Sequence, residues 1–374
     1  MTTDSEPRTW IDVSPALTQR AGIARYVRGI TEALVTLDPS TLGTYSHSWT
    51  TPGVQPFGVP HTGSRTSARA WRMNLMIGHL LNRTILPGVN RFDHFLATDL
   101  AFPFASESRV VVTVHDLTAV THSGTHTPLT KVYTRFMLAR LRKSQHRIIA
   151  VSHRTARDLS NHAGIDPRRV TVIHPGVAEV FFQSPDRRQS RIVLDRYGLT
   201  QPFALTVGTL EPRKNLGLLI SAFEEIAKPS ETLVIVGGKG WGDEATLETQ
   251  YRHSSQVRVL GFIPDSDLAC LYQSCQVFLM PSLYEGFGSP IAEALACEAS
   301  VICSDQCGAV ELAEGEVTLV DPLVKAQISD SMRQHLDATR PTSPKSRPRV
   351  RSYGATALHI ATSFPDIFGG SNNL

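Results

Sequence analysis

The stretch that most constrains the fold of this chain lies at residues 281–296 and reads PSLYEGFGSPIAEALA. An apolar run at 277–280 precedes it and is typical of a buried parallel strand, whereas residues 291–297 have the composition of a helix. Gly286 and Gly288 allow the backbone of the loop to approach a ligand closely, and the following Ser-Pro pair suits a helix start. This unit predicts a parallel α/β sheet whose loop binds an anionic or hydroxyl-rich ligand through unpaired N–H groups.

Two carboxylates belong to the same stretch. Glu285 lies on the predicted loop, and Glu293 lies about two turns into the predicted helix. We therefore expect the two side chains to share one edge of a cleft, where carboxylates are suited to binding hydroxyl groups.

The length of 374 residues is enough for two domains of ordinary size, and a 41% hydrophobic content is typical of a globular protein with a real core. No apolar run reaches the roughly 18 residues of a membrane-spanning helix. The polar, acidic segment 1–8 does not resemble a secretory signal. The five cysteines show no metal-ligand spacing and are expected to be reduced thiols, which predicts a cytoplasmic protein.

The net charge is only +3, but residues 1–180 contain 20 Lys and Arg against 12 Asp and Glu. The basic excess is concentrated in two acid-free stretches, 64–91 and 117–157, in which basic and apolar residues alternate. Basic amphipathic segments bind anionic bilayers in some proteins and are ordinary solvated helix faces in others, and both interpretations stay open. No nucleic-acid partner is expected.

Three further candidates lie where predicted strands end, the edge at which open α/β sheets bind ligands. His115 follows the apolar run 110–114, although a histidine at a strand end can also be purely structural. Arg213 and Lys214 lie between a strand at 203–208 and a helical pattern from Leu216. A planar guanidinium and a compact ammonium beside a helix start are suited to neutralising a diphosphate, and two solvated cations are the simpler alternative.

Three motifs follow one another in a familiar order: His-Asp-Leu at 115–117, Glu-Pro-Arg-Lys-Asn at 211–215, and Glu-Gly-Phe-Gly-x-Pro-x-x-Glu-Ala at 285–294. Together they resemble the retaining glycosyltransferases of the large "glycosyl transferases group 1" family, most of all bacterial polysaccharide and O-antigen mannosyltransferases. The resemblance covers roughly residues 11–322. It implies the GT-B fold, in which two Rossmann-like α/β domains have parallel sheets that face each other across a cleft.

The resemblance also implies roles for individual residues. The catalytic set would be His115, Arg213, Lys214 and Glu285. The donor-binding set would be Gly22, Gly208, Phe262, Ile263, Gly286, Phe287, Gly288 and Glu293. The family has a glycine-rich turn where this chain has Ala21-Gly22, so Gly22 is either a ligand-facing glycine or one needed only for helix packing. Asp265 and Asp267 imitate a metal-binding pair but suit a helix cap better, so no catalytic metal and no cofactor are expected.

By the same resemblance the chain would transfer a hexosyl group, with mannosyl from GDP-mannose as the best assignment, to a glycan or lipid-linked acceptor. Its expected partners are the nucleotide sugar and that acceptor, in the cytoplasm. If the two basic segments bind lipid, the protein would also contact an anionic membrane peripherally, on the cytoplasmic face of the inner membrane. A nucleotide-sugar epimerase of the same build and a degenerate, non-catalytic homologue remain as alternatives.

The domain organisation expected from the sequence has three parts. Residues 1–195 form an acceptor-side domain, and residues 196–338 form the nucleotide-sugar-binding domain. Residues 339–374, rich in Pro, Ser and Arg at first and ending in Gly, Ser and Asn, lack clear amphipathic periodicity and predict a poorly ordered tail.

Overall fold

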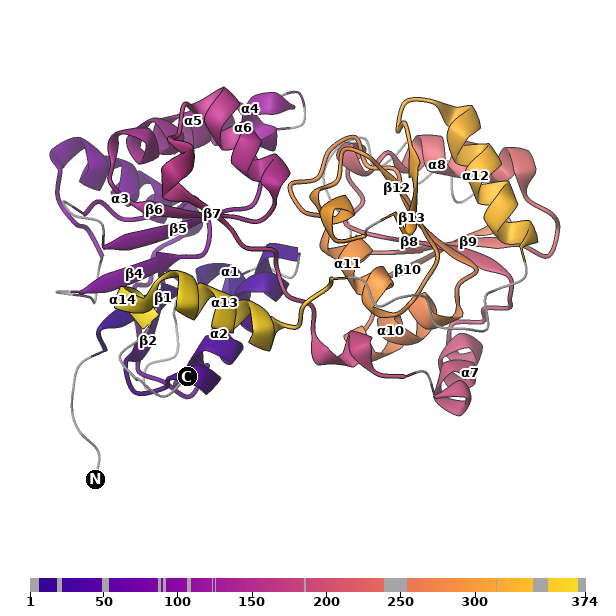
Figure 1. Cartoon of the computed structure of the whole chain (residues 1–374), viewed down its shortest axis with the longest axis horizontal. Helices are drawn as coiled ribbons and strands as arrows, with labels where there is room; N and C mark the ends of the chain where they lie inside the picture. Colours follow the sequence, from indigo (N-terminus) through magenta and orange to yellow (C-terminus); the bar gives the residue numbers. More distant parts are fainter. Residues whose placement is uncertain are drawn as a thin grey trace. The chain divides into compact units, whose positions relative to one another are not determined.

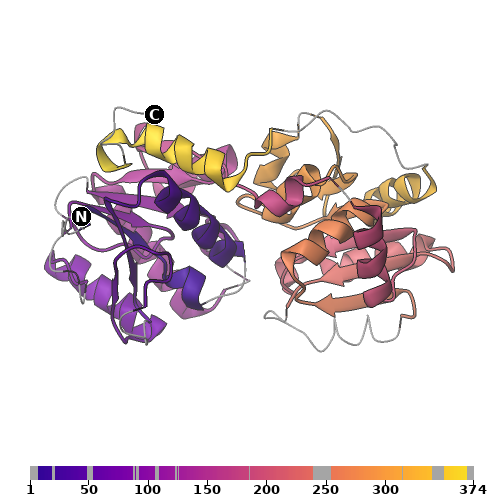
Figure 2. The same cartoon turned by 90° about the horizontal axis from the view of Figure 1, so that it is seen from below.

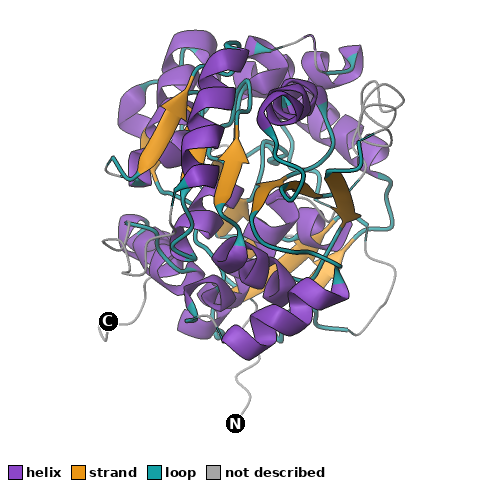
Figure 3. Cartoon of the chain, turned by 90° about the vertical axis from the view of Figure 1, so that its right-hand side faces the viewer, coloured by secondary structure: helices purple, strands orange, loops and turns teal. Residues whose placement is uncertain are grey.

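The computed structural model of the chain describes residues 7–18, 22–48, 54–86, 89, 92–105, 109–122, 124, 126–184, 186–238, 254–313, 315–338 and 349–368. The chain folds into two compact units. Unit 1 contains Met1–Gly176 together with Arg351–Leu374, and unit 2 contains Val177–Val350. Each unit is a parallel sheet with helices on both faces, as the sequence predicts (Figures 1 and 3).

Unit 1 contains a seven-stranded sheet in the order β3-β2-β1-β4-β5-β6-β7, in which all neighbouring strands are parallel. The order reverses between β1 and β4, which makes that position a switch point of a doubly wound sheet. The strands are Thr9–Asp12 (β1), Leu42–Ser46 (β2), His61–Gly63 (β3), His94–Ala97 (β4), Val110–Val114 (β5), Arg147–Ala150 (β6) and Val170–Val172 (β7).

The two faces of this sheet are covered by different helices because successive strand residues point to opposite sides. Val110 and Val112 pack with α3 and α5, whereas Val111 packs with α2 and α13 (Figure 1). The helices of unit 1 are Ser14–Thr18 (α1), Gly22–Leu37 (α2), Ala68–Leu81 (α3), Thr118–Thr121 (α4), Pro128–Lys143 (α5), His153–Ala163 (α6), the 3-10 turn Pro167–Arg169 (η2), Tyr353–Ser363 (α13) and Pro365–Phe368 (α14).

The C-terminal segment corrects the expectation of a poorly ordered tail. α13 begins at a Ser352 cap and packs along α2, and Figure 2 shows the two helices side by side. Ile360 and Phe364 are buried in the core of unit 1. Arg147 forms a bidentate ion pair with Asp366, in which each nitrogen–oxygen distance is 2.8 Å. The sequence favours a poorly ordered tail because α13 shows little amphipathic periodicity and follows a stretch rich in Pro, Ser and Arg. Residues 339–348 and 369–374 of the same expectation lie outside the described residues.

The division of the chain also differs from the expected one. The break falls after Gly176 rather than after residue 195. Residues 177–195 contain η3 and most of α7, which pack on α10 of unit 2. Arg196 at the end of α7 donates to the buried Asp267 of α10 at 2.7 Å, so this polar segment belongs to unit 2.

Unit 2 contains a six-stranded parallel sheet in the order β10-β9-β8-β11-β12-β13. Its strands are Phe203–Val207 (β8), Thr232–Val236 (β9), Val257–Gly261 (β10), Val277–Met280 (β11), Val301–Ser304 (β12) and Val317–Val320 (β13). Its helices and 3-10 turns are Glu179–Phe182 (η3), Arg187–Arg196 (α7), Pro212–Lys214 (η4), Leu216–Ile226 (α8), Asp265–Ser274 (α10), Ser289–Ala296 (α11), Gly308–Leu312 (η5) and Lys325–Asp337 (α12). α8 and α12 cover one face, and α10 and α11 lie on the other (Figure 1).

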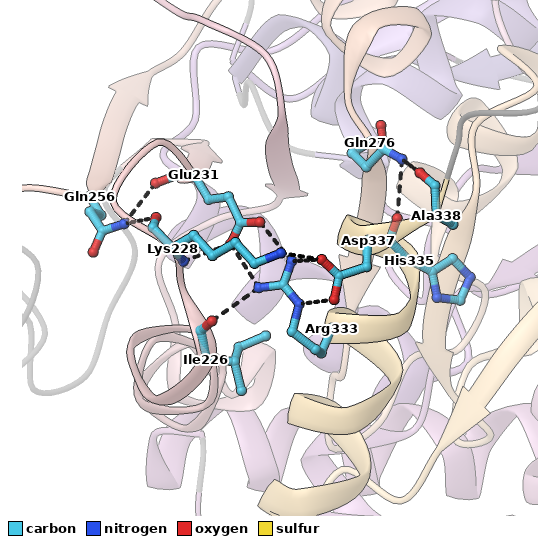
Figure 4. Close-up of polar contacts among 9 residues, drawn as sticks. All are labelled: Ile226, Lys228, Glu231, Gln256, Gln276, Arg333, His335, Asp337 and Ala338. Carbon is cyan, nitrogen blue, oxygen red and sulfur yellow. Dashed lines mark hydrogen bonds and ion pairs between the residues drawn. The ribbon is translucent and has the colours of Figure 1, made fainter.

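A polar network fixes α12 to the amino-terminal side of β9 (Figure 4). Arg333 donates to both oxygens of the buried Glu231, at 2.6 and 2.9 Å, and also to Asp337 one turn later on α12. Gln256 donates to the backbone oxygens of Lys228 and Glu231, which secures the loop before β9. Among the helices that the structure describes, none is long and apolar enough to cross a membrane.

Candidate functional site

The candidate residues of unit 2 lie on the loops that follow β8 and β11. These two strands are neighbours in the centre of the sheet, and β9 and β12 lie on their outer sides. The strand order therefore reverses between β8 and β11, and the loops at their carboxyl ends frame the switch point where open α/β sheets bind ligands.

The loop after β8 is held tightly against its neighbours. The Gly208 N–H donates to the Val236 oxygen at 2.9 Å, and the Leu210 N–H donates to the Gly238 oxygen at 3.1 Å. A Cβ on Gly208 would lie 3.0 Å from Cε of Lys214, so the glycine makes room for the lysine side chain that crosses it. The close approach of Lys214 thus explains why a glycine occupies position 208.

The predicted cations and the loop glutamate form one ion-pair network. Lys214 Nζ contacts Glu285 Oε1 at 2.7 Å, and Arg213 Nη1 contacts Glu285 Oε2 at 2.7 Å. The other arm of the guanidinium contacts Glu211 Oε1 at 2.5 Å. Each of the four side chains is at most 15% exposed, so the interior rather than solvent sets the strength of these contacts.

The charges of this network determine the state of Glu285. Burial alone would raise the pKa of its carboxyl, but attraction to Lys214 and Arg213, with their hydrogen bonds, outweighs it and lowers the pKa to about 2. Glu285 is therefore ionised throughout the physiological range. It holds both cations through its two oxygens.

Asn215 connects three loops of unit 2. Its backbone has the left-handed conformation, with φ of 58°, which ends η4 and begins α8. Its side-chain amide donates to the Pro281 oxygen at 3.2 Å and to the Pro322 oxygen at 2.6 Å, and thus joins the ends of β8, β11 and β13. The Leu283 N–H in turn donates to the Arg213 oxygen at 2.9 Å.

The second loop leads into α11 as a turn that requires glycine. Gly288 has φ of 94° and directly precedes the helix, which starts at Ser289 with Pro290 in its first turn. Phe287 is buried, and its backbone oxygen accepts from the Ala309 N–H at 2.6 Å. Gly286 lies between Phe287 and Glu285, so the carboxylate and the helix start are carried by one short segment.

Glu293 lies just over one turn into α11, because the helix begins at Ser289; the sequence-based estimate of two turns is wrong. Glu293 is 2% exposed, and its carboxylate accepts from the Tyr272 hydroxyl at 3.1 Å. Tyr272 comes from α10 and packs edge-on against Phe278 of the sheet. This contact fixes the orientation of the glutamate.

The turn after β10 carries the two residues predicted to pass the nucleobase. Phe262 is 61% exposed, whereas Ile263 is 3% exposed and packs inward. The following Asp265 and Asp267 lie in the first turn of α10, and Pro264 holds the cap position. The two aspartates are therefore first-turn acids of the helix and not the cap residue itself. Among the described residues, no group of three or more His, Cys, Asp and Glu side chains could hold a metal ion. The expectation that catalysis needs no metal stays a prediction.

In unit 1, His115 follows β5 directly and is half-buried. Its Nε2 donates to the Thr98 oxygen at 2.9 Å, because a carbonyl only accepts, and its ring packs edge-on against Tyr26. Burial lowers the pKa of His115, so the ring is neutral at pH 7 with Nδ1 as an acceptor. The adjacent Asp116 accepts from the Thr118 N–H and hydroxyl and thus shapes the turn before α4.

Gly22 is the first residue of α2. A Cβ at this position would meet no atom of the described residues within 4 Å, so packing against the described helices does not require glycine here. This removes the packing explanation for Gly22 as far as those helices are concerned. Ala21, the other half of the turn, lies outside the described residues.

The structure brings together Gly208, Arg213, Lys214, Glu285, Gly286, Phe287 and Gly288 in unit 2, whereas His115 and Gly22 belong to unit 1. Sequence reasoning gave no role to Glu211 and Asn215, which hold the site in place. Both lie inside the Glu-Pro-Arg-Lys-Asn motif. An acidic residue two positions before Arg213 could have indicated that Glu211 pairs with it. The position of Asn215 just before the helical pattern of α8 could have indicated a residue that shapes the helix start.

Known proteins agree with this architecture. Residues 20–179 match the family model "Glycosyltransferase Family 4", and residues 195–355 match "Glycosyl transferases group 1". A crystal structure of Anabaena HepE in complex with UDP and glucose superposes with a TM-score of 0.73, covers 96% of this chain and 100% of that one, and is 16% identical. The fold is therefore GT-B. Residues 195–355 therefore belong to the family of glycosyl transferases group 1, and the two matches together span most of the chain.

Two relatives from Escherichia coli are more similar in sequence. O-antigen chain mannosyltransferase B is 38% identical over 152 residues, which are 38% of this chain and 39% of that protein. The serotype-specific mannosyltransferase WbdA is 33% identical over 187 residues, which are 47% of this chain and 22% of that protein. The matched segments thus span well under half of each relative's length.

Proposed function

We propose that the protein is a retaining glycosyltransferase that moves a hexosyl group from a nucleoside diphosphate sugar to a glycan or lipid-linked acceptor. The observation that carries the proposal is the Arg213–Lys214–Glu285 network at the switch point of unit 2. It sets two oriented cations beside the start of α11, a combination suited to a diphosphate.

Mannosyl transfer from GDP-mannose is the proposed specificity. Its support is the similarity to two mannosyltransferases, one of them an O-antigen chain enzyme. Synthesis of a cell-surface polysaccharide is the corresponding role. All five cysteines are free and buried, which supports a reducing, cytoplasmic compartment.

In the proposed reaction the bond from the anomeric carbon to the diphosphate oxygen breaks, and negative charge grows on the leaving diphosphate. Arg213 and Lys214 stabilise that charge with donors that are already oriented, so little reorganisation is needed. The acceptor hydroxyl forms its bond to the anomeric carbon on the face that the diphosphate leaves, and its proton passes to the departing phosphate oxygen. Retention of configuration follows.

The remaining residues bind the donor. Glu285 and the backbone of Phe287 and Gly288 bind sugar hydroxyls, and Glu293, fixed by Tyr272, binds the ribose hydroxyls. Phe262 and Ile263 pass the nucleobase. In unit 1, Gly22 keeps the ligand-facing role that its place at the start of α2 suggests. In the same unit, the hydrogen bond from His115 Nε2 to Thr98 leaves Nδ1 free to accept a hydrogen bond from a sugar hydroxyl.

The test is a transfer assay with purified protein, GDP-mannose and, in parallel, UDP-glucose and ADP-glucose, with a mannan oligosaccharide as acceptor and an excess of EDTA in one arm. We expect transfer from GDP-mannose, insensitivity to EDTA, and a product whose NMR spectrum shows the anomeric configuration of the donor. Donor conversion without any acceptor would instead indicate an epimerase. An absence of both transfer and nucleotide binding would indicate a non-catalytic homologue.

A further inference from the structure

Most of the exposed large apolar side chains among the described residues of unit 1 lie on α3 and α5. On α3, Met73, Leu80 and Leu81 are 54%, 65% and 60% exposed. On α5, Leu129 and Val132 are 63% and 60% exposed. We call these five residues, with Ile77 of α3 and the basic residues among them, the α3–α5 surface.

The apolar residues of α3 occupy two opposite sides of the helix. Trp71, Leu75 and Gly78 are buried and face the core of unit 1. Successive helical residues are rotated by about 100°, so Met73 and Leu80 project from the side opposite to this set. An ordinary solvated helix would have polar residues on that side. The core does not account for the outward apolar residues.

Both helices pack on the same face of the sheet, because their buried residues share one core with Val110 and Val112 (Figure 1). They are also fastened to each other. The Arg72 guanidinium lies 5.2 Å from the centre of the Tyr133 ring, and Arg140 Nη2 donates to Asn82 Oδ1 at 3.0 Å and to the His79 oxygen. The α3–α5 surface is therefore held on two joined helices and not on a single loop.

The charge of this surface has one sign. Residues 64–91 and 117–157 contain no Asp or Glu. The exposed face of α3 includes Arg69 and Arg72, and that of α5 includes Arg135, Arg142 and Lys143. Arg72 and Arg140 are engaged between the helices, whereas Arg69 and Arg135 lie on the outward faces beside the exposed apolar residues. A partner must therefore be anionic and apolar at once, which describes the headgroup and acyl boundary of an anionic bilayer.

We propose that the α3–α5 surface docks peripherally on an anionic phospholipid bilayer. Met73, Leu80, Leu129 and Val132 enter the boundary between headgroups and acyl chains, and the arginines bind lipid phosphates. The inference rests on this surface alone and not on the proposed transferase activity. For an enzyme with a lipid-linked acceptor, such docking holds the protein at the membrane that carries the acceptor.

The test is co-sedimentation of the whole protein with vesicles made of equal parts phosphatidylglycerol and phosphatidylcholine, and with vesicles of phosphatidylcholine alone. We expect binding to the mixed vesicles that weakens as salt screens the arginines, and little binding to the neutral ones. The double variant Arg69→Glu/Arg135→Glu should lose binding by at least about 25-fold, since each basic residue contributes roughly fivefold. Leu80→Ser/Val132→Ser should weaken binding at low and at high salt.

Matched controls come from unit 2. Arg191→Glu on α7 changes an exposed charge, and Leu323→Ser changes an apolar residue that is 76% exposed. Both should bind vesicles like the unaltered chain. Circular dichroism and GDP binding of every variant separate a folding defect from a docking defect and from a failure of the nucleotide site.

Two outcomes would overturn the proposal. One is that the unaltered protein does not sediment with the mixed vesicles. The other is that the α3–α5 variants bind as well as the controls. If the same variants instead abolished a concentration-dependent dimer, the surface would be an interface between copies of this chain.

Discussion

At the scale of single residues, Glu285 sets the arrangement of the site. One carboxylate receives Lys214 on one oxygen and Arg213 on the other, both at 2.7 Å. With Glu211 the four formal charges cancel. A bound diphosphate would add negative charge beside Arg213 and Lys214. As the bond to the sugar breaks, the charge on the diphosphate grows, and its attraction to the two cations then increases more than their attraction to the carboxylates decreases.

Lys214→Ala is expected to lower kcat/KM by about 100-fold, or about 3 kcal/mol, the scale of losing one preorganised donor to developing charge. Arg213 remains to hold Glu285, so the fold should be kept. Steady-state kinetics with GDP-mannose measures the effect. Lys325→Ala, which removes an exposed ion pair to Glu225, is the matched control and should leave kcat/KM unchanged. A Lys214→Ala enzyme with near-normal kcat/KM would exclude the proposed role.

The pH dependence of stability tests the same network. The pKa of Glu285 is about 2 in the folded chain and close to its ordinary value of 4.5 when unfolded. The contribution of Glu285 to the free energy of unfolding is therefore complete above about pH 5 and is lost as the pH falls toward 2. This contribution is at most roughly 3 kcal/mol. Urea unfolding of the unaltered chain and of Glu285→Gln should show a stability difference that shrinks on acidification. A difference independent of pH would contradict the ion pairing.

Sequence reasoning worked for some residues and not for others, for a physical reason. Arg213, Lys214 and Glu285 were found because charged side chains on loops after apolar strands point to a ligand edge. Asn215 received no role because its function depends on a left-handed backbone and on carbonyls contributed by Pro281 and Pro322. Such contacts arise only from tertiary structure.

At the scale of elements, α12 depends on one buried ion pair. The Glu231 side chain is 3% exposed, and hydrogen bonds from Arg333 lower the pKa of its carboxyl (Figure 4). Removing Arg333 leaves that carboxylate without its guanidinium partner in the interior. The network lies at the amino-terminal side of β9, whereas the candidate site lies at the carboxyl ends of the strands.

Arg333→Ala is therefore expected to lower the free energy of unfolding by about 3 kcal/mol. Lys228→Ala removes only the exposed contact to Asp337 and should cost less than about 1 kcal/mol. Chemical denaturation measures both, and nucleotide affinity in the native state should be unaffected by either. If the two variants lost equal free energies of unfolding, the burial of Glu231 would not contribute to the stability of the fold.

Elements with strong patterns were predicted, and those that depend on context were not. The apolar strands β5, β9 and β11 follow directly from the sequence. β2, with the sequence LGTYS, was not identified, because a glycine at its second position and the polar residues after it hide a strand that is buried throughout. α13 was missed as well, although Ser352 followed by an alanine-rich segment is a usable helix-start signal.

At the scale of the whole molecule, the chain returns to its first unit after completing the second. Residues 351–368 pack into the core of unit 1, and Thr9 donates to the Ile367 oxygen at 2.8 Å. Unit 1 is therefore complete only when both ends of the described chain are in place. The sequence indicated two α/β domains correctly, but the assignment of the last helices required the three-dimensional contacts.

The central claim is that unit 2 binds a nucleoside diphosphate through Arg213 and Lys214. Its most direct test is isothermal titration of GDP, UDP, ADP and dTDP into the unaltered protein and into Arg213→Ala/Lys214→Ala. We predict binding of GDP in preference to the others, and a loss of at least about 100-fold in the double variant, since charge-assisted contacts contribute about 1.5–3 kcal/mol each. Equal GDP affinity in the two proteins, or no binding of any nucleotide by the folded unaltered chain, would contradict the account.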